Sequence, residues 1–154
     1  MKKKITALVM AAAMCLSFAA CGSDNGGETA DDTYTVGICQ LVQHQALDAA
    51  TQGFKDALKE ELGDKVEFIE QNASNDINTC STICNGFVSD GVDLILANAT
   101  PALQAAVSAT QTIPILGTAV TEYGVALDID NFSGTVGGNV SGTSDLAPLD
   151  QQAA

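Results

Sequence analysis

From Tyr34 onward the chain alternates short apolar runs with segments whose apolar residues recur at the helical period, and this alternation restricts the fold more than any other feature. Strands are predicted over residues 34–41, 66–69, 92–97 and 113–116, with a weaker edge strand over 125–129. Helices are predicted over residues 46–62, 76–89 and 102–109. Strands that alternate with helices form βαβ units. The sequence therefore predicts an α/β, flavodoxin-like parallel sheet with helices on both faces, in one domain.

The N-terminus has the pattern of an export signal. Three lysines follow Met1, and an apolar run over residues 5–20, too short to span a bilayer comfortably, ends at Cys21. The end of the run, Phe18-Ala19-Ala20-Cys21, resembles the lipobox of bacterial lipoproteins. The alternative is an ordinary secretory signal, but the polar residues directly after Cys21 favour a lipoprotein. We expect a signal peptide over 1–20, lipid attachment at Cys21 and a flexible tether over 21–33.

The charge balance excludes one class of partner. Once residues 1–20 are removed, three lysines remain against 19 acidic residues, a net charge of −16. Nucleic acid and anionic membrane surfaces both require a basic patch, so neither is an expected partner. The acidic side chains do not form a D-x-D-x-D-G loop, and no metal site or cofactor is predicted from them.

Beyond the signal and the lipid site at Cys21, three cysteines remain: Cys39, Cys80 and Cys84. This odd number does not suggest a disulfide framework. Cys80 and Cys84 are four residues apart in a helical pattern and so share one helix face, with no nearby histidine to complete a zinc site. We expect all three to be small buried side chains.

Polar residues follow each predicted strand, in the segments 40–44, 72–75, 98–101 and 117–121. These segments carry amides, hydroxyls and the single histidine, but few charges. In an open parallel sheet, ligands bind outside the carboxyl ends of the strands. A neutral polar rim suits a small zwitterion or a neutral solute. The candidate ligand-binding residues on this rim are His44, Asn98, Thr100, Pro101 and Thr118.

Thr100 and Pro101 form the most informative pair. Thr favours the N-cap of a helix and Pro the first helical turn, and the free backbone N–H groups at such an end attract a carboxylate. The alternative is a well-formed helix start without a ligand. Two roles also remain open for His44, which could line the pocket or cap the first helix. Asn98 could orient the carboxylate-binding loop or satisfy buried backbone groups.

Four segments together resemble a known family. VGICQLVQHQALDAATQGFKDAL, DLILANATPALQAA, IPILGTAV and GGNVSGTSDLAP are similar to the substrate-binding lipoproteins of ABC importers, nearest to the branch assigned tryptophan or related aromatic amino acids. That family has the type I periplasmic-binding-protein fold, with two α/β lobes and the ligand between them. The resemblance implies that residues 34–145 form the first lobe and that 146–154 start the crossover to a second lobe, which this chain does not contain.

The resemblance also implies site residues and partners. The segment Ala99-Thr100-Pro101 would hold the carboxylate of an amino acid, and Asp145 in GTSD would lie at the cleft and bind its ammonium group. The partners would be an ABC permease and its ATPase. The protein would be lipid-anchored outside the cytoplasm, on the outer face of the cytoplasmic membrane or in the periplasm.

Three other functions compete with this one. An enzyme on a flavodoxin-like fold is not supported, because the chain has no G-x-G-x-x-G, no P-loop lysine and no G-x-S-x-G motif, and a single histidine. A binding protein for a sugar, a nucleoside or another small signal solute stays open. Sugar-binding relatives are expected to have more aromatic residues than this chain, which has 5% aromatic residues and no tryptophan. A non-binding remnant is the third alternative.

Overall fold

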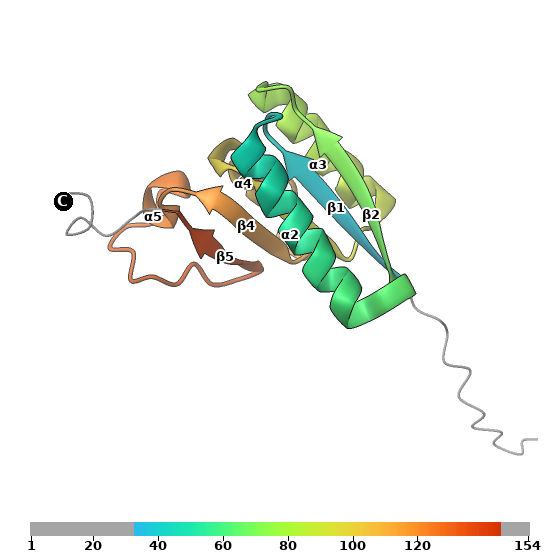
Figure 1. Cartoon of the computed structure of the whole chain (residues 1–154). Coiled ribbons are helices and arrows are strands. Elements are labelled where there is room, and N and C mark those ends of the chain that lie inside the picture. The colour runs from blue at the N-terminus through green and yellow to red at the C-terminus, as the bar shows by residue number, and fades with distance from the viewer. Residues whose placement is uncertain (1–32, 146–154) are drawn as a thin grey trace, which may run out of the picture. The chain divides into compact units, whose positions relative to one another are not determined.

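The computed structural model describes residues 33–145, which form a parallel sheet flanked by helices (Figure 1). The strands are β1 (Tyr34–Gln40), β2 (Val66–Asn72), β3 (Leu94–Asn98), β4 (Ile115–Val120) and β5 (Val140–Ser144). The helices are α2 (Gln45–Leu62), α3 (Ile77–Asp90), α4 (Thr100–Ala109) and the short α5 (Tyr123–Ala126), with a 3₁₀ turn η1 (Gly63–Lys65) after α2. Within the described residues, none of these helices has the length and apolarity needed to cross a membrane.

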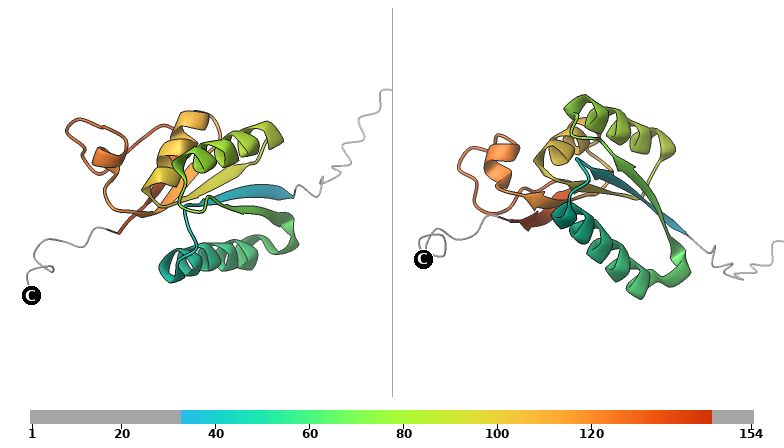
Figure 2. Two further views of the ribbon diagram at one scale, coloured as in Figure 1. Left: turned by 90° about the horizontal axis from the view of Figure 1, so that it is seen from above. Right: turned by 45° about the horizontal axis from the view of Figure 1, so that its top comes forward.

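The sheet confirms the predicted fold class. Its strand order is β2-β1-β3-β4-β5, and every neighbouring pair runs parallel. This is the flavodoxin-like order, in which the connections reverse direction beside β1. Helix α2 therefore covers one face, while α3 and α4 cover the other (Figure 2).

Alternating side chains of the central strands build two apolar layers. Val36 and Ile38 of β1 pack in a small cluster with Phe54 and Leu58 of α2. Cys39, the neighbour of Ile38, belongs instead to the larger cluster shared with α3 and α4. Because both faces of the central strands are buried, these strands read as continuous apolar runs in the sequence.

The predicted edge strand over residues 125–129 is wrong. The Glu122 carboxylate accepts hydrogen bonds from the amides of Gly124 (2.8 Å) and Val125 (2.6 Å), which starts the short helix α5 instead. Asp128, with a φ of 55°, then turns the chain out of an extended path. The edge position is taken by β5, a polar strand near the end of the predicted first lobe.

Three expectations fall outside the described residues. The signal peptide over 1–20 with Cys21, the tether up to residue 32, and the crossover over 146–154 stay predictions from the sequence.

Candidate functional site

The parallel sheet brings all the predicted ligand-binding residues to its carboxyl edge. The last residues of β2, β1 and β3 lie in register, with Asn72 beside Gln40 and Gln40 beside Asn98. Thr118 of β4 continues the row beside Asn98. His44, Thr100 and Pro101 follow β1 and β3 directly, and Asp145 follows β5. The carboxyl edge of the sheet therefore carries a polar row across four strands, as the sequence predicts.

Helix α4 starts at this edge without a side-chain cap. Its N-cap is Ala99, not Thr100 as predicted, and Pro101 is the second helical residue. The methyl group of Ala99 cannot accept a hydrogen bond. By contrast, side chains of His44, Asp76 and Glu122 cap α2, α3 and α5.

The first turn of α4 therefore contains backbone amide groups that have no hydrogen-bond acceptor. The Leu103 amide reaches the Ala99 carbonyl (3.1 Å), and Pro101 has no N–H. Within residues 33–145, the amides of Thr100 and Ala102 have no hydrogen-bond partner. Two donors at the positive end of a ten-residue helix form a favourable position for a carboxylate.

The backbone at this edge is strained. Ala99 has a φ of 94° and a ψ of 156°, a region that is essentially restricted to glycine. Ala119 (φ 52°), Ser74 (φ 52°) and Asn75 (φ 65°) are also left-handed, in the segments after β2 and within β4. Such conformations cost about 1–3 kcal/mol each and cluster at ligand-binding sites. The strained residues thus lie at the carboxyl edge of the sheet, where the sequence predicts ligand binding.

Asn98 anchors α2 to the sheet from a fully buried position. Its amide nitrogen donates to the Leu47 carbonyl (2.8 Å) and to the Thr51 hydroxyl (2.9 Å). The Thr51 hydroxyl donates in turn to Gln40 Oε1 (2.8 Å), and Gln40 Nε2 donates to the Asp48 carboxylate (2.6 Å). The Asn98 Oδ1 atom is buried and has no partner.

Two roles were open for Asn98: to orient the carboxylate-binding loop or to satisfy buried backbone groups. The bond to the Leu47 carbonyl gives it the second role. Sequence reasoning missed the other members of this network, Gln40, Thr51 and Asp48. Gln40 could have been found from the sequence, because it is a polar residue at the end of a buried strand. Thr51 and Asp48 lie within a helical pattern that gives no such signal.

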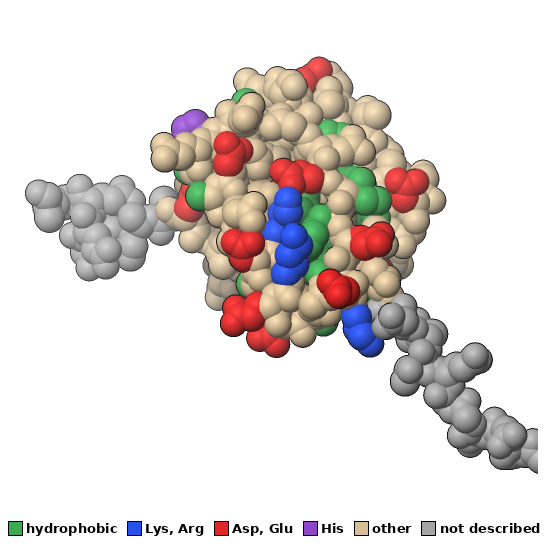
Figure 3. Space-filling view, turned by 45° about the vertical axis from the view of Figure 1, so that its right-hand side comes forward, with side chains coloured by type: hydrophobic (Ala, Val, Ile, Leu, Met, Phe, Trp, Pro, Cys, Tyr) green, Lys and Arg blue, Asp and Glu red, His purple; other side chains and the backbone are tan. Residues whose placement is uncertain are grey.

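His44 caps α2, because its Nδ1 accepts a hydrogen bond from the Ala46 amide (3.2 Å). This is the structural role of the two considered. The ring is exposed, and it is visible on the rim of the molecule in Figure 3. His44 therefore lies at the candidate site while it also stabilises the helix start.

Thr118 and Asp145 lie at the β4 and β5 end of the row. The Thr118 carbonyl accepts from the Ala99 amide (2.9 Å), and its side chain is half-buried. The Asp145 amide donates to the Val120 carbonyl (3.0 Å), which fixes the backbone of Asp145 beside β4. Asp145 itself is exposed, and its carboxylate forms no ion pair among the described residues.

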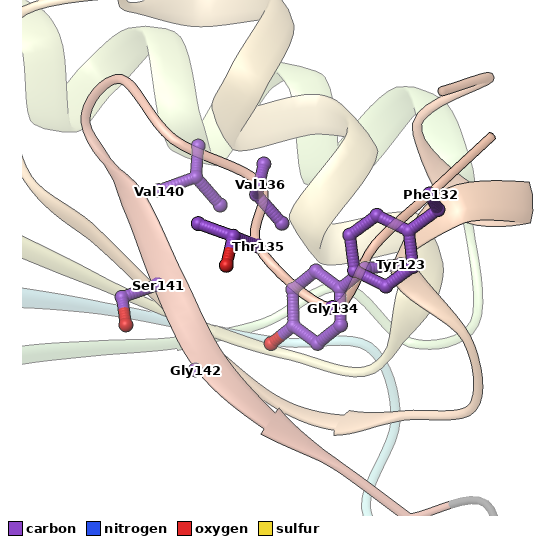
Figure 4. A pocket seen from close by; sticks show the side chains of 8 residues that line it. All are labelled: Tyr123, Phe132, Gly134, Thr135, Val136, Val140, Ser141 and Gly142. Atoms are coloured by element: carbon purple, nitrogen blue, oxygen red, sulfur yellow. The ribbon is translucent and has the colours of Figure 1, made fainter. Parts of the chain in front are cut away.

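A separate cavity of about 250 Å³ lies between β5 and the loop before it (Figure 4). Tyr123 and Phe132 form part of its wall. The Tyr123 hydroxyl donates to the Gly117 carbonyl (3.0 Å), and burial raises the pKa of Tyr123. The cavity is smaller than an ordinary ligand pocket and contains none of the predicted site residues.

The charges of the described surface are mainly acidic. The ammonium groups of Lys55 and Lys59 lie 5.8 and 5.9 Å from the centre of the Phe68 ring, and Lys55 pairs with Glu70 (2.7 Å). Figure 3 shows a few basic side chains among scattered acidic ones on one face of the molecule. Within residues 33–145, no group of His, Cys, Asp and Glu side chains is placed to hold a metal ion.

Comparison with known proteins identifies relatives along nearly the whole chain. Residues 35–154 match the family model described as ABC transporter substrate binding protein. A tyrosine-binding protein of Clostridioides difficile is 40% identical over 97% of this chain and 46% of its own length. The chain thus spans about half the length of this relative.

Solved structures agree with this match. The ligand-free, open structure of a substrate-binding protein with adhesive properties from Clostridium difficile has 44% identity and a TM-score of 0.69, over 77% of this chain and 41% of that one. A Streptococcus pneumoniae ABC domain in complex with L-Trp has 34% identity and a TM-score of 0.70, over 77% and 41%. A Vibrio cholerae conserved domain protein has 40% identity and a TM-score of 0.72, over 79% and 42%. The chain, with its parallel sheet and polar carboxyl edge, belongs to the family of ABC transporter substrate-binding proteins.

Proposed function

We propose that this chain forms the first lobe of a two-lobed solute-binding protein of an ABC importer, and that the solute is a hydrophobic or aromatic amino acid. The uncapped start of α4 at the polar edge of the sheet is the observation that supports this most. Two similar proteins bear on the solute class, one named a tyrosine-binding protein and one solved with L-Trp. A free amino acid is a zwitterion, and it suits a rim of amides and hydroxyls with one nearby carboxylate.

Each end of the amino acid has a proposed partner. The carboxylate accepts hydrogen bonds from the Thr100 and Ala102 amides, beside Pro101 and the Thr118 hydroxyl. The ammonium group donates to the exposed Asp145 carboxylate. His44 lies on the rim, and Asn98 positions the α2 segment from behind. A charge-assisted hydrogen bond is about twice as strong as a neutral one, so the two charged ends would supply much of the specificity.

The cellular setting follows from the same proposal. The protein would work outside the cytoplasm, held at the membrane by a lipid on Cys21. Its partners would be an ABC permease and the permease ATPase. The tether over 21–33 would hold the lobe roughly 20 Å or less from the membrane surface.

Binding should require a second wall. Proteins of this kind hold a solute by hinge closure of two lobes, which buries most of the solute surface. Residues 33–145 provide one side of such a cleft. The chain alone should therefore bind L-tyrosine or L-tryptophan weakly, with a Kd above the micromolar range. It should also tend to associate, because surface normally covered by the second lobe is exposed.

The test uses a chimera in which this chain continues, after residue 154, into the remaining half of the C. difficile tyrosine-binding protein. Calorimetry should detect micromolar or tighter binding of L-tyrosine or L-tryptophan to the chimera. The change Asp145→Asn removes the charge and keeps the shape. It should weaken binding about 10- to 100-fold, the equivalent of roughly 1.5–3 kcal/mol.

The matched control is Asp64→Asn, which removes a carboxylate from η1, at the opposite edge of the sheet. This variant should bind as the unaltered chimera does. Equal affinity for Asp145→Asn and Asp64→Asn would remove Asp145 from the site. A well-folded chimera that binds no free amino acid would favour the sugar, nucleoside or other-solute alternative, and tight binding by the chain alone, as a monomer, would refute the two-walled site.

A further inference from the structure

Three thiols from distant parts of the chain meet in the core, away from the candidate ligand site. Cys39 comes from β1, and Cys80 and Cys84 come from consecutive turns of α3. All three are free and completely buried, in the same apolar cluster. Cys39 lies near enough to both Cys84 and Cys80 to interact with each of them, and more strongly with Cys84. The sequence predicts their burial but not that they touch one another.

A close contact between α3 and β1 explains why the thiols meet. A Cβ atom on Gly37 would lie 2.7 Å from the Phe87 ring, so the ring rests directly on the backbone of β1. Cys39 is two residues beyond Gly37, on the same face of the strand and about 6.6 Å along it. Because α3 connects two parallel strands, it runs antiparallel to β1.

The positions along α3 then determine which thiol faces Cys39. Measured from Phe87, Cys84 is about 4.5 Å and Cys80 about 10.5 Å along the helix axis. Cys39, at about 6.6 Å, falls between them and nearer to Cys84. The close packing at Gly37 and this spacing together bring Cys39 nearer to Cys84 than to Cys80.

We propose that Cys39 and Cys84 are a modification site that forms an intramolecular disulfide, with Cys80 kept as a free thiol. Two S–H bonds break and one S–S bond forms. Two electrons and two protons pass to the disulfide of an external carrier, a small molecule or a thiol oxidoreductase, which becomes two thiols. The proposal rests on the extracytoplasmic location proposed above, since disulfides persist in oxidising compartments.

Burial determines when the bond can form. Both thiols are completely buried in the folded protein, so the exchange takes place before α3 has packed on β1. One thiolate attacks the external disulfide, and the second thiol then resolves the mixed disulfide. Once α3 has packed, burial and the neighbouring Cys84 raise the pKa of Cys39, so a pair that is still reduced at that stage reacts poorly.

The test starts from the full chain with Cys15→Ser and Cys21→Ser, which leaves only the three core cysteines. The protein is unfolded, refolded in a buffer of oxidised and reduced glutathione, alkylated under denaturing conditions and digested with trypsin without reduction. Cys39 lies before Lys55, and the other two cysteines follow Lys65. A bond between β1 and α3 therefore joins two tryptic peptides, whereas a bond within α3 does not.

We expect joined peptides with Cys39 bonded to Cys84 and with Cys80 alkylated. The control Cys39→Ala should give separate peptides with both remaining cysteines alkylated. The oxidised protein should melt at least about 5 °C above its reduced form, because the bond closes a long loop of the unfolded chain. Three alkylated cysteines at every glutathione ratio, a bond to Cys80, or a melting temperature no higher than that of the reduced form would overturn the proposal. None of these measurements depends on ligand binding.

Discussion

The contact between Gly37 and Phe87 makes a quantitative prediction for the change Gly37→Ala. Gly37 lies in β1, between β2 and β3, and Phe87 is completely buried in α3. The added methyl group would come within 2.7 Å of two ring atoms and 3.0 Å of a third. Carbon atoms in contact prefer about 3.5–4.0 Å, so the ring or the whole helix must move.

Two opposing terms set the magnitude. Overpacking a core usually costs about 1–3 kcal/mol. Replacing glycine within a strand returns about 0.5–1 kcal/mol of backbone entropy. The free energy of unfolding should therefore fall by about 0.5–2 kcal/mol. For a domain of this size, that corresponds to a decrease of roughly 2–8 °C in Tm.

The assay is urea unfolding followed by far-ultraviolet circular dichroism, in the presence of a reductant. Gly86→Ala is the control in the same helix, because a Cβ atom there meets nothing within 4 Å. This control should gain about 0.5–1 kcal/mol from helix propensity. In the double variant Gly37→Ala/Phe87→Leu, the smaller side chain makes room for the methyl group. The two changes should then cost at least about 0.5 kcal/mol less together than the sum of their separate costs. The reasoning would be refuted if Gly37→Ala were as stable as the unaltered protein. It would also be refuted if the costs of Gly37→Ala and Phe87→Leu in free energy of unfolding were strictly additive.

The remaining predictions concern strain, titration and the anchor. Ala99→Gly should raise Tm by a few degrees, because glycine adopts without strain a conformation that costs alanine about 1–3 kcal/mol; a lower Tm would argue against strain at this position. Tyr123→Phe removes a hydrogen bond and should cost about 0.5–1.5 kcal/mol at pH 7, measured by urea unfolding. Because the pKa of Tyr123 is raised by burial, its stabilising effect is complete below the unfolded pKa of about 10 and is lost as the pH rises through the folded pKa. The difference from the unaltered protein should narrow above pH 10, and a constant difference would contradict this account. Cys21→Ser should move the protein from the membrane to the soluble fraction of fractionated cells, because stable anchoring needs two acyl chains; equal membrane retention would count against a lipoprotein.

The sequence by itself determined the fold class and the edge of the sheet at which the candidate site residues lie. Local periodicity separates strands from helices, and a parallel sheet places all strand ends at one edge. His44, Thr100 and Thr118 could therefore be assigned to one rim without coordinates. The resemblance of four segments to a family agreed with the family match found for residues 35–154.

The tertiary structure decided the features that depend on contacts between distant residues. The polar strand β5 has no apolar alternation, and it is a strand because β4 supplies its hydrogen-bond partners. Ala99 replaces Thr100 as the N-cap because the bond from its amide to Thr118 on the neighbouring strand holds it in a strained conformation. The Asn98 network and the contact of Cys39 with α3 also depend on residues that lie far apart in the sequence. Periodicity describes how one segment buries one face. Which side chains then meet depends on how closely two segments pack, and a missing Cβ atom at Gly37 is enough to change that.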